Sequence, residues 1–118
     1  MKAAFGVYKY KDKYYIFPGE FGHAPFIAIV DLDSEKIIEI KDNPYKAYEG
    51  KGKFKKMAQV VGDVNFIVAG EFGEDANKMI QMFGIIPVVV KHMELEEAIK
   101  RVKENLEKIK GATQVVSV

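Results

Sequence analysis

The chain of 118 residues has room for one domain, which we assign to residues 1–118. It contains no cysteine, which excludes disulfides, thiolate catalysis and thiolate metal ligands. Its formal net charge of +1 gives no overall attraction to nucleic acid or to a membrane surface, and no apolar run is long enough to span a bilayer. We therefore expect a cytoplasmic protein without a membrane partner, for which nucleic acid is not the expected partner either.

The first part of the chain predicts an antiparallel group of strands. Residues 3–10 mix apolar and aromatic side chains, and residues 14–17 predict a short return strand after a polar turn. The segment 25–32, PFIAIVDL, is apolar on both faces, and residues 36–41, KIIEIK, predict its hairpin partner. The hydrophilic residues 42–53 then predict a mobile loop.

Helices and strands alternate in the rest of the chain. Apolar side chains at helical spacing predict helices over residues 54–61, 74–83 and 94–110. Two short apolar runs, residues 65–69 and 85–90, lie between these helices and are typical of buried strands.

Together these elements predict an α/β fold. Strands joined by helices run parallel, and right-handed crossovers place the helices on the faces of the sheet. We predict a five-stranded mixed sheet of order 3-2-1-4-5, with the first strand central and about three helices, which is ribonuclease-H-like topology. The tail, residues 111–118, is either a small edge strand or a frayed end. An exposed edge strand allows a weak dimer as well as a monomer.

Two stretches carry a resemblance to a known family. Residues 20–29 read EFGHAPFIAI, with DNP following at 42–44, and residues 65–90 read NFIVAGEFGEDANKMIQMFGIIPVVV. The chain resembles the dinitrogenase iron–molybdenum cofactor biosynthesis family, the small NifX-like proteins and the C-terminal domain of NifB. That family typically has His-Phe-Gly-x-Ala-Pro before one strand and Gly-Gly-x-Gly after another. Glu20 stands here at the histidine, and Glu71 at the second glycine.

The resemblance implies a non-catalytic binding or carrier domain. Its ligand would be an iron–sulfur or iron–molybdenum precursor cluster, and its partner another protein of cofactor assembly. The implied ligand-binding residues lie in two glycine-bearing loops and are Glu20, Phe21, Gly22, His23, Gly70, Glu71 and Gly73.

The sheet topology points to the same loops. Ligands of open α/β sheets gather outside the carboxyl ends of the parallel strands. That edge is expected to bring together the loops at residues 18–24, 70–75 and 91–93. Their side chains would gather Glu20, His23, Glu71, Glu74, Asp75 and His92.

The two histidines are the candidate metal ligands, because neutral imidazole suits iron and zinc. His23 is the first candidate and His92 the second, with Glu20 or Glu71 completing the set. The alternatives are two ordinary surface histidines and, at residues 70–73, a tight structural turn.

A lysine-rich stretch supports a different function. Lys51, Lys53, Lys55 and Lys56, interleaved with aromatic residues, predict a module that binds an anion, nucleic acid or a protein partner through charge and stacking. The plainer interpretation is a solvated loop. A metal-dependent hydrolase follows only by analogy of fold, and residues 3–10 supply none of the carboxylates that two-metal chemistry needs. We therefore expect a protein that is not an enzyme.

Overall fold

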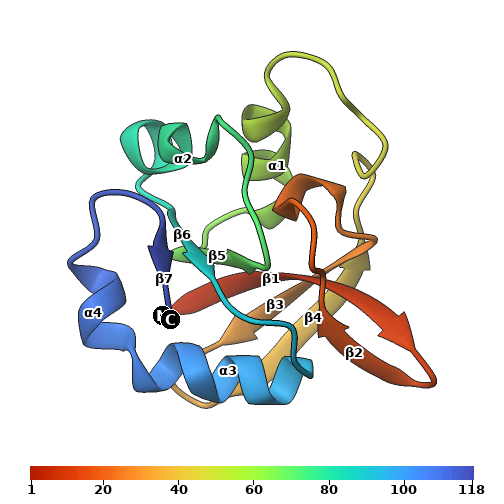
Figure 1. The fold of residues 1–118 in the computed structure, drawn as a ribbon, viewed down its shortest axis with the longest axis vertical. Helices are drawn as coiled ribbons and strands as arrows, with labels where there is room; N and C mark the ends of the chain where they lie inside the picture. Colours follow the sequence, from red (N-terminus) through yellow and green to blue (C-terminus); the bar gives the residue numbers. More distant parts are fainter.

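The computed structural model describes residues 1–118 and shows a mixed seven-stranded sheet with four helices (Figure 1). The strands are β1 Lys2–Tyr10, β2 Lys13–Ile16, β3 Phe26–Asp31, β4 Lys36–Asp42, β5 Phe66–Ala69, β6 Ile86–Val89 and β7 Val116–Ser117. The helices are α1 Lys53–Val61, α2 Ala76–Phe83, α3 Leu95–Glu104 and α4 Leu106–Lys110, with a short 3-10 turn, η1, at Phe21–His23. None of these helices has the length and apolarity needed to cross a membrane.

The sheet has the order β4-β3-β1-β5-β6-β7, with β2 paired to β1. β1 runs antiparallel to β2 and β3 and parallel to β5, and β6 and β7 continue in parallel. The prediction of a mixed α/β sheet is confirmed. The predicted count of five strands is wrong, because the return strand β2 and the tail strand β7 also pair with the sheet.

The prediction of about three helices is also corrected, since the helix predicted over residues 94–110 is divided at Asn105. The backbone of Asn105 has φ −109° and ψ 17°, and its side-chain amide donates to the carbonyl of Arg101 at 2.8 Å. Asparagine competes in this way for backbone groups of the preceding turn, which favours a helix end.

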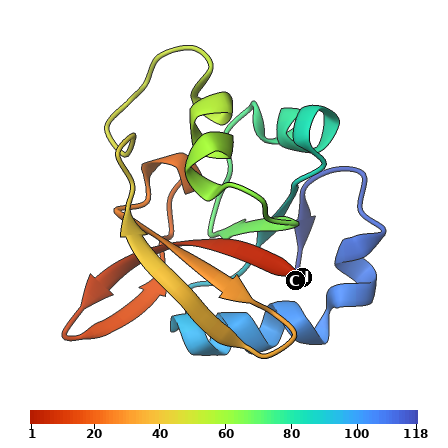
Figure 2. The same cartoon turned by 180° about the vertical axis from the view of Figure 1, so that it is seen from behind.

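Side chains alternate between the two faces of the sheet and form two cores. Helices α3 and α4 cover one face and α1 and α2 the other, as Figures 1 and 2 show from opposite sides. On β1, Phe5 and Val7 enter the core under α3, whereas Ala4 enters the core under α1 and α2. Gly6 leaves room for η1 to pack on β1, since a Cβ there would lie 3.1 Å from that of Ala24. Small residues on β1 thus bring η1 against the sheet.

Candidate functional site

The two glycine-bearing loops lie side by side where β5 ends. The N–H of Phe21 donates to the carbonyl of Glu71 at 3.0 Å, and the N–H of Gly70 donates to the carbonyl of Phe17 at 3.0 Å. Gly70 is required at this contact, because a Cβ there would lie 2.8 Å from Cα of Pro18. The structure therefore brings together two of the three loops that the topology predicts to meet.

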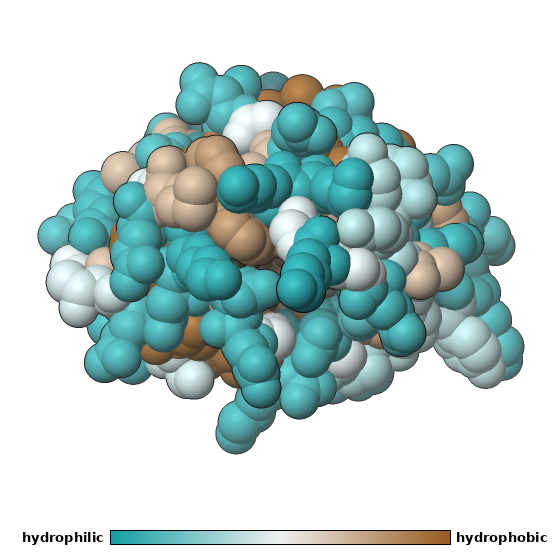
Figure 3. Space-filling view, turned by 90° about the horizontal axis from the view of Figure 1, so that it is seen from above, coloured by the Kyte–Doolittle hydropathy of each residue, from teal (hydrophilic) through white to brown (hydrophobic).

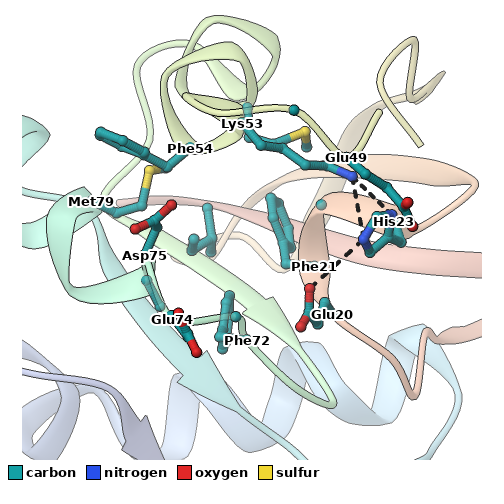
Figure 4. A pocket seen from close by; sticks show the side chains of 16 residues that line it. Glu20, Phe21, His23, Glu49, Lys53, Phe54, Phe72, Glu74, Asp75 and Met79 are labelled. Atoms are coloured by element: carbon teal, nitrogen blue, oxygen red, sulfur yellow. Dashed lines mark hydrogen bonds and ion pairs between the residues drawn. The ribbon is translucent and has the colours of Figure 1, made fainter. Parts of the chain in front are cut away.

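A pocket of about 480 Å³ opens between η1 and the N-terminal ends of α1 and α2 (Figure 4). This volume lies within the range of ordinary ligand pockets. The apolar lining is formed by Phe21, Phe54, Met57, Ile67, Phe72, Ala76 and Met79. The ionisable lining is formed by Glu20, His23, Glu49, Lys53, Glu74 and Asp75. This end of the molecule is covered mostly by hydrophilic side chains, with smaller apolar areas between them (Figure 3).

The hydrogen bonds of His23 define how its ring faces the pocket. Nδ1 lies 2.7 Å from the carbonyl oxygen of Lys46. Because a carbonyl can only accept, Nδ1 carries the proton and donates it. The lone pair of the neutral ring is then on Nε2, which lies 3.7 Å from Oε2 of Glu20. A metal-binding histidine commonly donates its other N–H to a backbone carbonyl in this way.

Lys53 lies over the face of the His23 ring. Its Nζ is 2.8 Å from Nδ1 and 3.5 Å from Nε2 (Figure 4). The two ring nitrogens point away from each other, so an ammonium donating to Nδ1 in the plane of the ring would lie much farther than 3.5 Å from Nε2. Lys53 therefore does not donate to Nδ1. The ammonium instead donates to the carbonyl of Tyr48 at 2.6 Å. Burial lowers the pKa of Lys53 from its ordinary 10.5, while the charges of Glu20 and Glu49 act to raise it.

Two glycines make room for these charged side chains. A Cβ on Gly73 would lie 3.2 Å from Oε2 of Glu20, so the carboxylate rests against that turn. A Cβ on Gly22 would lie 2.7 Å from Cε of Lys53, so the lysine stem rests against η1. The glycines of both loops thus set where Glu20 and Lys53 reach the pocket.

Asn43 connects the loop before α1 to η1. Its side-chain amide donates to the carbonyls of Gly22 and Ala24 at 2.9 and 3.0 Å, and its side-chain oxygen accepts from the N–H of Tyr45 at 3.0 Å. Asn43 belongs to the DNP motif at residues 42–44 but is not among the predicted site residues. The asparagine before a proline was the signal available in the sequence.

The structure places His92 away from the pocket. Its Nε2 lies 2.5 Å from the hydroxyl of Tyr8, and its ring packs near-parallel to those of Tyr8 and Tyr15, with centroids 5.8 Å away in both cases. The expected third loop, residues 91–93, contributes nothing to the pocket lining. Of the two histidines, His23 alone faces the pocket.

Some of the other predicted site residues line the pocket and others do not. The pocket lining includes Gly22, Gly73, Glu74 and Asp75 but not Gly70 or Glu71, whose backbones hold the loops together. Among the lysines predicted to bind an anion or a partner, only Lys53 lines the pocket. Lys55 instead lies 6.0 Å from the ring centroid of Phe54, and Lys56 lies 5.2 and 5.1 Å from those of Tyr45 and Tyr48. Lysines of the same chain thus already contact these aromatic rings.

Comparison with known proteins decides the family. The family model for the dinitrogenase iron-molybdenum cofactor matches residues 10–105. The chain belongs to this family. An NMR structure of a candidate NifB protein from Thermotoga aligns with 92% of this chain and 89% of its own, with a TM-score of 0.63. Its 16% sequence identity supports a shared fold alone. No curated protein matches the chain.

This member of the dinitrogenase iron-molybdenum cofactor family offers few protein ligands for a metal. It has no cysteine, and nowhere do three histidine, aspartate or glutamate side chains gather in a metal-binding arrangement. The pocket provides one imidazole nitrogen with a lone pair and one neighbouring carboxylate, from His23 and Glu20. Two protein donors are too few to complete the coordination of a metal ion, so a metal bound here would have to bring most of its own ligands.

Proposed function

We propose that this protein binds an iron-containing cluster, the iron–molybdenum cofactor or a precursor, as cargo in the pocket and delivers it to another protein of cofactor assembly. The observation that carries the proposal is the position of His23 in the pocket lining, with its Nε2 3.7 Å from Oε2 of Glu20 (Figure 4). The proposal includes a single ribonuclease-H-like domain that acts in the cytoplasm as a carrier and not as an enzyme.

The available donors suit cargo that is already assembled. Building a cluster on a protein ordinarily takes several cysteine thiolates, and this chain contains none. An assembled cluster keeps its own sulfides and needs one or two protein ligands. Two ligands of one tetrahedral metal ion lie roughly 3.3 Å apart. The separation of 3.7 Å between Nε2 of His23 and Oε2 of Glu20 is close to that value, so one iron of a cluster can contact both.

The charges in the pocket favour one side of it for the cargo. Glu74 and Asp75 line the α2 side, where an anionic cluster would meet repulsion. Lys53 is the one lysine of the lining and lies beside His23. The apolar floor, including Met57 and Met79, would exclude water beneath the cluster. The cargo is therefore expected to sit against His23 and Lys53.

Iron retention tests the proposal. The protein is incubated anaerobically with a preassembled iron–sulfur cluster held by small thiolates, desalted and assayed for iron per chain. We expect wild type to retain iron and His23→Ala to lose at least about 10-fold in iron affinity, because the variant lacks the nitrogen ligand. His92→Ala is the matched control and should retain iron as wild type does, because His92 lies outside the pocket. Equal retention by His23→Ala and wild type would refute the assignment of the ligand.

A further inference from the structure

The ammonium of Lys53 lies beside the groups of the pocket that could bind a metal ion. It donates to the carbonyl of Tyr48 at 2.6 Å and lies 2.8 and 3.5 Å from the two ring nitrogens of His23. The carboxylates of Glu20 and Glu49 are near enough to act on its charge. Carbonyl oxygen, imidazole and carboxylates are also the groups that bind a divalent cation.

The path of the lysine stem to this position is specific. Gly22 has no side chain, and a Cβ there would lie 2.7 Å from Cε and 3.4 Å from Cδ of Lys53. The stem therefore crosses η1 directly over Gly22. Since α1 begins at Lys53, the first residue of the helix is anchored while its ammonium reaches into the pocket.

A free metal ion bound to Nε2 of His23 would lie close to this ammonium. Nζ is only 3.5 Å from Nε2, and a bound ion lies about 2 Å from its nitrogen ligand. Like charges a few ångströms apart in a partly buried site repel strongly. An assembled cluster meets no such repulsion, because sulfide already neutralises its metal charge and the ammonium can contact the sulfide.

We propose that Lys53 is a tethered cation that keeps free divalent metal ions out of the pocket, so that the pocket accepts metal only as an assembled cluster. The inference rests on the proposed function insofar as His23 and Glu20 face the cargo. It adds that Lys53 makes the pocket select an assembled cluster over a single metal ion.

Titration of the empty protein with Co²⁺ alone, followed by calorimetry and by the visible absorption of the bound ion, tests the inference. We expect Lys53→Met to bind Co²⁺ at least about 10-fold more tightly than wild type, since the repelling charge is gone. Adding His23→Ala to Lys53→Met should abolish the gain. Lys55→Met is the matched control, because it removes the same charge from an exposed position outside the pocket and should not change Co²⁺ affinity.

A second variant separates the position of the ammonium from its charge. Gly22→Ala places a methyl group where the Lys53 stem lies, so the flexible stem must move while the net charge stays the same. We expect this variant also to gain Co²⁺ affinity over wild type. It additionally keeps the test open if Lys53→Met fails to fold.

The inference is overturned if neither Lys53→Met nor Gly22→Ala binds Co²⁺ more tightly than wild type, or if Lys55→Met gains as much as they do. Failure of the proposed function gives a different result, namely wild type that retains no iron after incubation with the preassembled iron–sulfur cluster. The two experiments use different metals and different variants, so either idea can fail without the other.

Discussion

Asn43 is the one buried polar side chain of the molecule, at 2% exposure, and its side chain bonds to η1, which lines the pocket. Its three hydrogen bonds satisfy two carbonyls of η1 and its C-cap and one N–H of the following loop. No helix or strand hydrogen bond satisfies these backbone groups, so the Asn43 side chain supplies their hydrogen-bond partners. A periodicity argument could not assign this role, since it depends on a contact with residues about twenty positions earlier.

We predict that Asn43→Ala lowers the free energy of unfolding by about 2–3 kcal/mol, because it leaves buried backbone groups unpaired. Urea denaturation of wild type and variant measures this difference. Asn77→Ala is the control: its side chain is exposed and accepts one hydrogen bond, from the N–H of Val115, so less than about 1 kcal/mol is expected. Equal losses in the two variants would show that the three bonds of Asn43 contribute no special stability.

The helices show which features of the elements a sequence reveals. The apolar stripe through Leu95, Val102 and Ile109 predicts where the last helical region packs, and all three are buried. The same stripe runs through the break at Asn105, so spacing alone predicts one helix where the structure has two. A hydrogen bond from one side chain to the preceding turn decides the break, and apolar periodicity does not record it.

The glycines that end helices give a prediction at this scale. Gly84 ends α2 in the left-handed region with φ +68°, whereas Gly111 follows α4 with φ −86°. Neither has an atom closer than 4.0 Å to an added Cβ, so the backbone alone decides the effect. We predict that Gly84→Ala destabilises the protein by about 1 kcal/mol and that Gly111→Ala does not, because only the first requires a positive φ. Thermal unfolding of both variants tests this, and equal stability would contradict it.

At the scale of the whole molecule, two of the three loops that strand order predicts to meet do meet in the structure, and the third lies elsewhere. Residues 91–93 do follow the carboxyl end of β6, as expected. The chain then pairs with β2, because the N–H of Ile16 donates to the carbonyl of Met93 at 2.9 Å and Tyr15 bridges to Glu94. An ion pair of 3.2 Å between Lys13 and Glu94 reinforces this contact. This pairing places His92 against the β1–β2 hairpin. Strand order alone does not predict a pairing between a loop and a hairpin.

This arrangement separates the pocket from the aromatic cluster of Tyr8, Tyr15 and His92. The pocket belongs to the face of the sheet that α1 and α2 cover, with Met57 and Met79 in its floor. Cargo bound there is expected to affect η1, the start of α1 and the start of α2. The β1–β2 hairpin should remain unaffected, because its residues take no part in the lining.

Amide NMR spectra of the empty protein and of the same protein loaded with a preassembled iron–sulfur cluster test the central claim most directly. Paramagnetic iron broadens the signals of nearby amides, so the affected residues locate the cargo. We expect broadening centred on residues 20–23, 49–54 and 73–79, with the signals of residues 8–15 and 92 unchanged. Broadening centred on residues 8–15 and 92 would contradict it, because the cargo would then lie at the hairpin and not in the pocket beside His23.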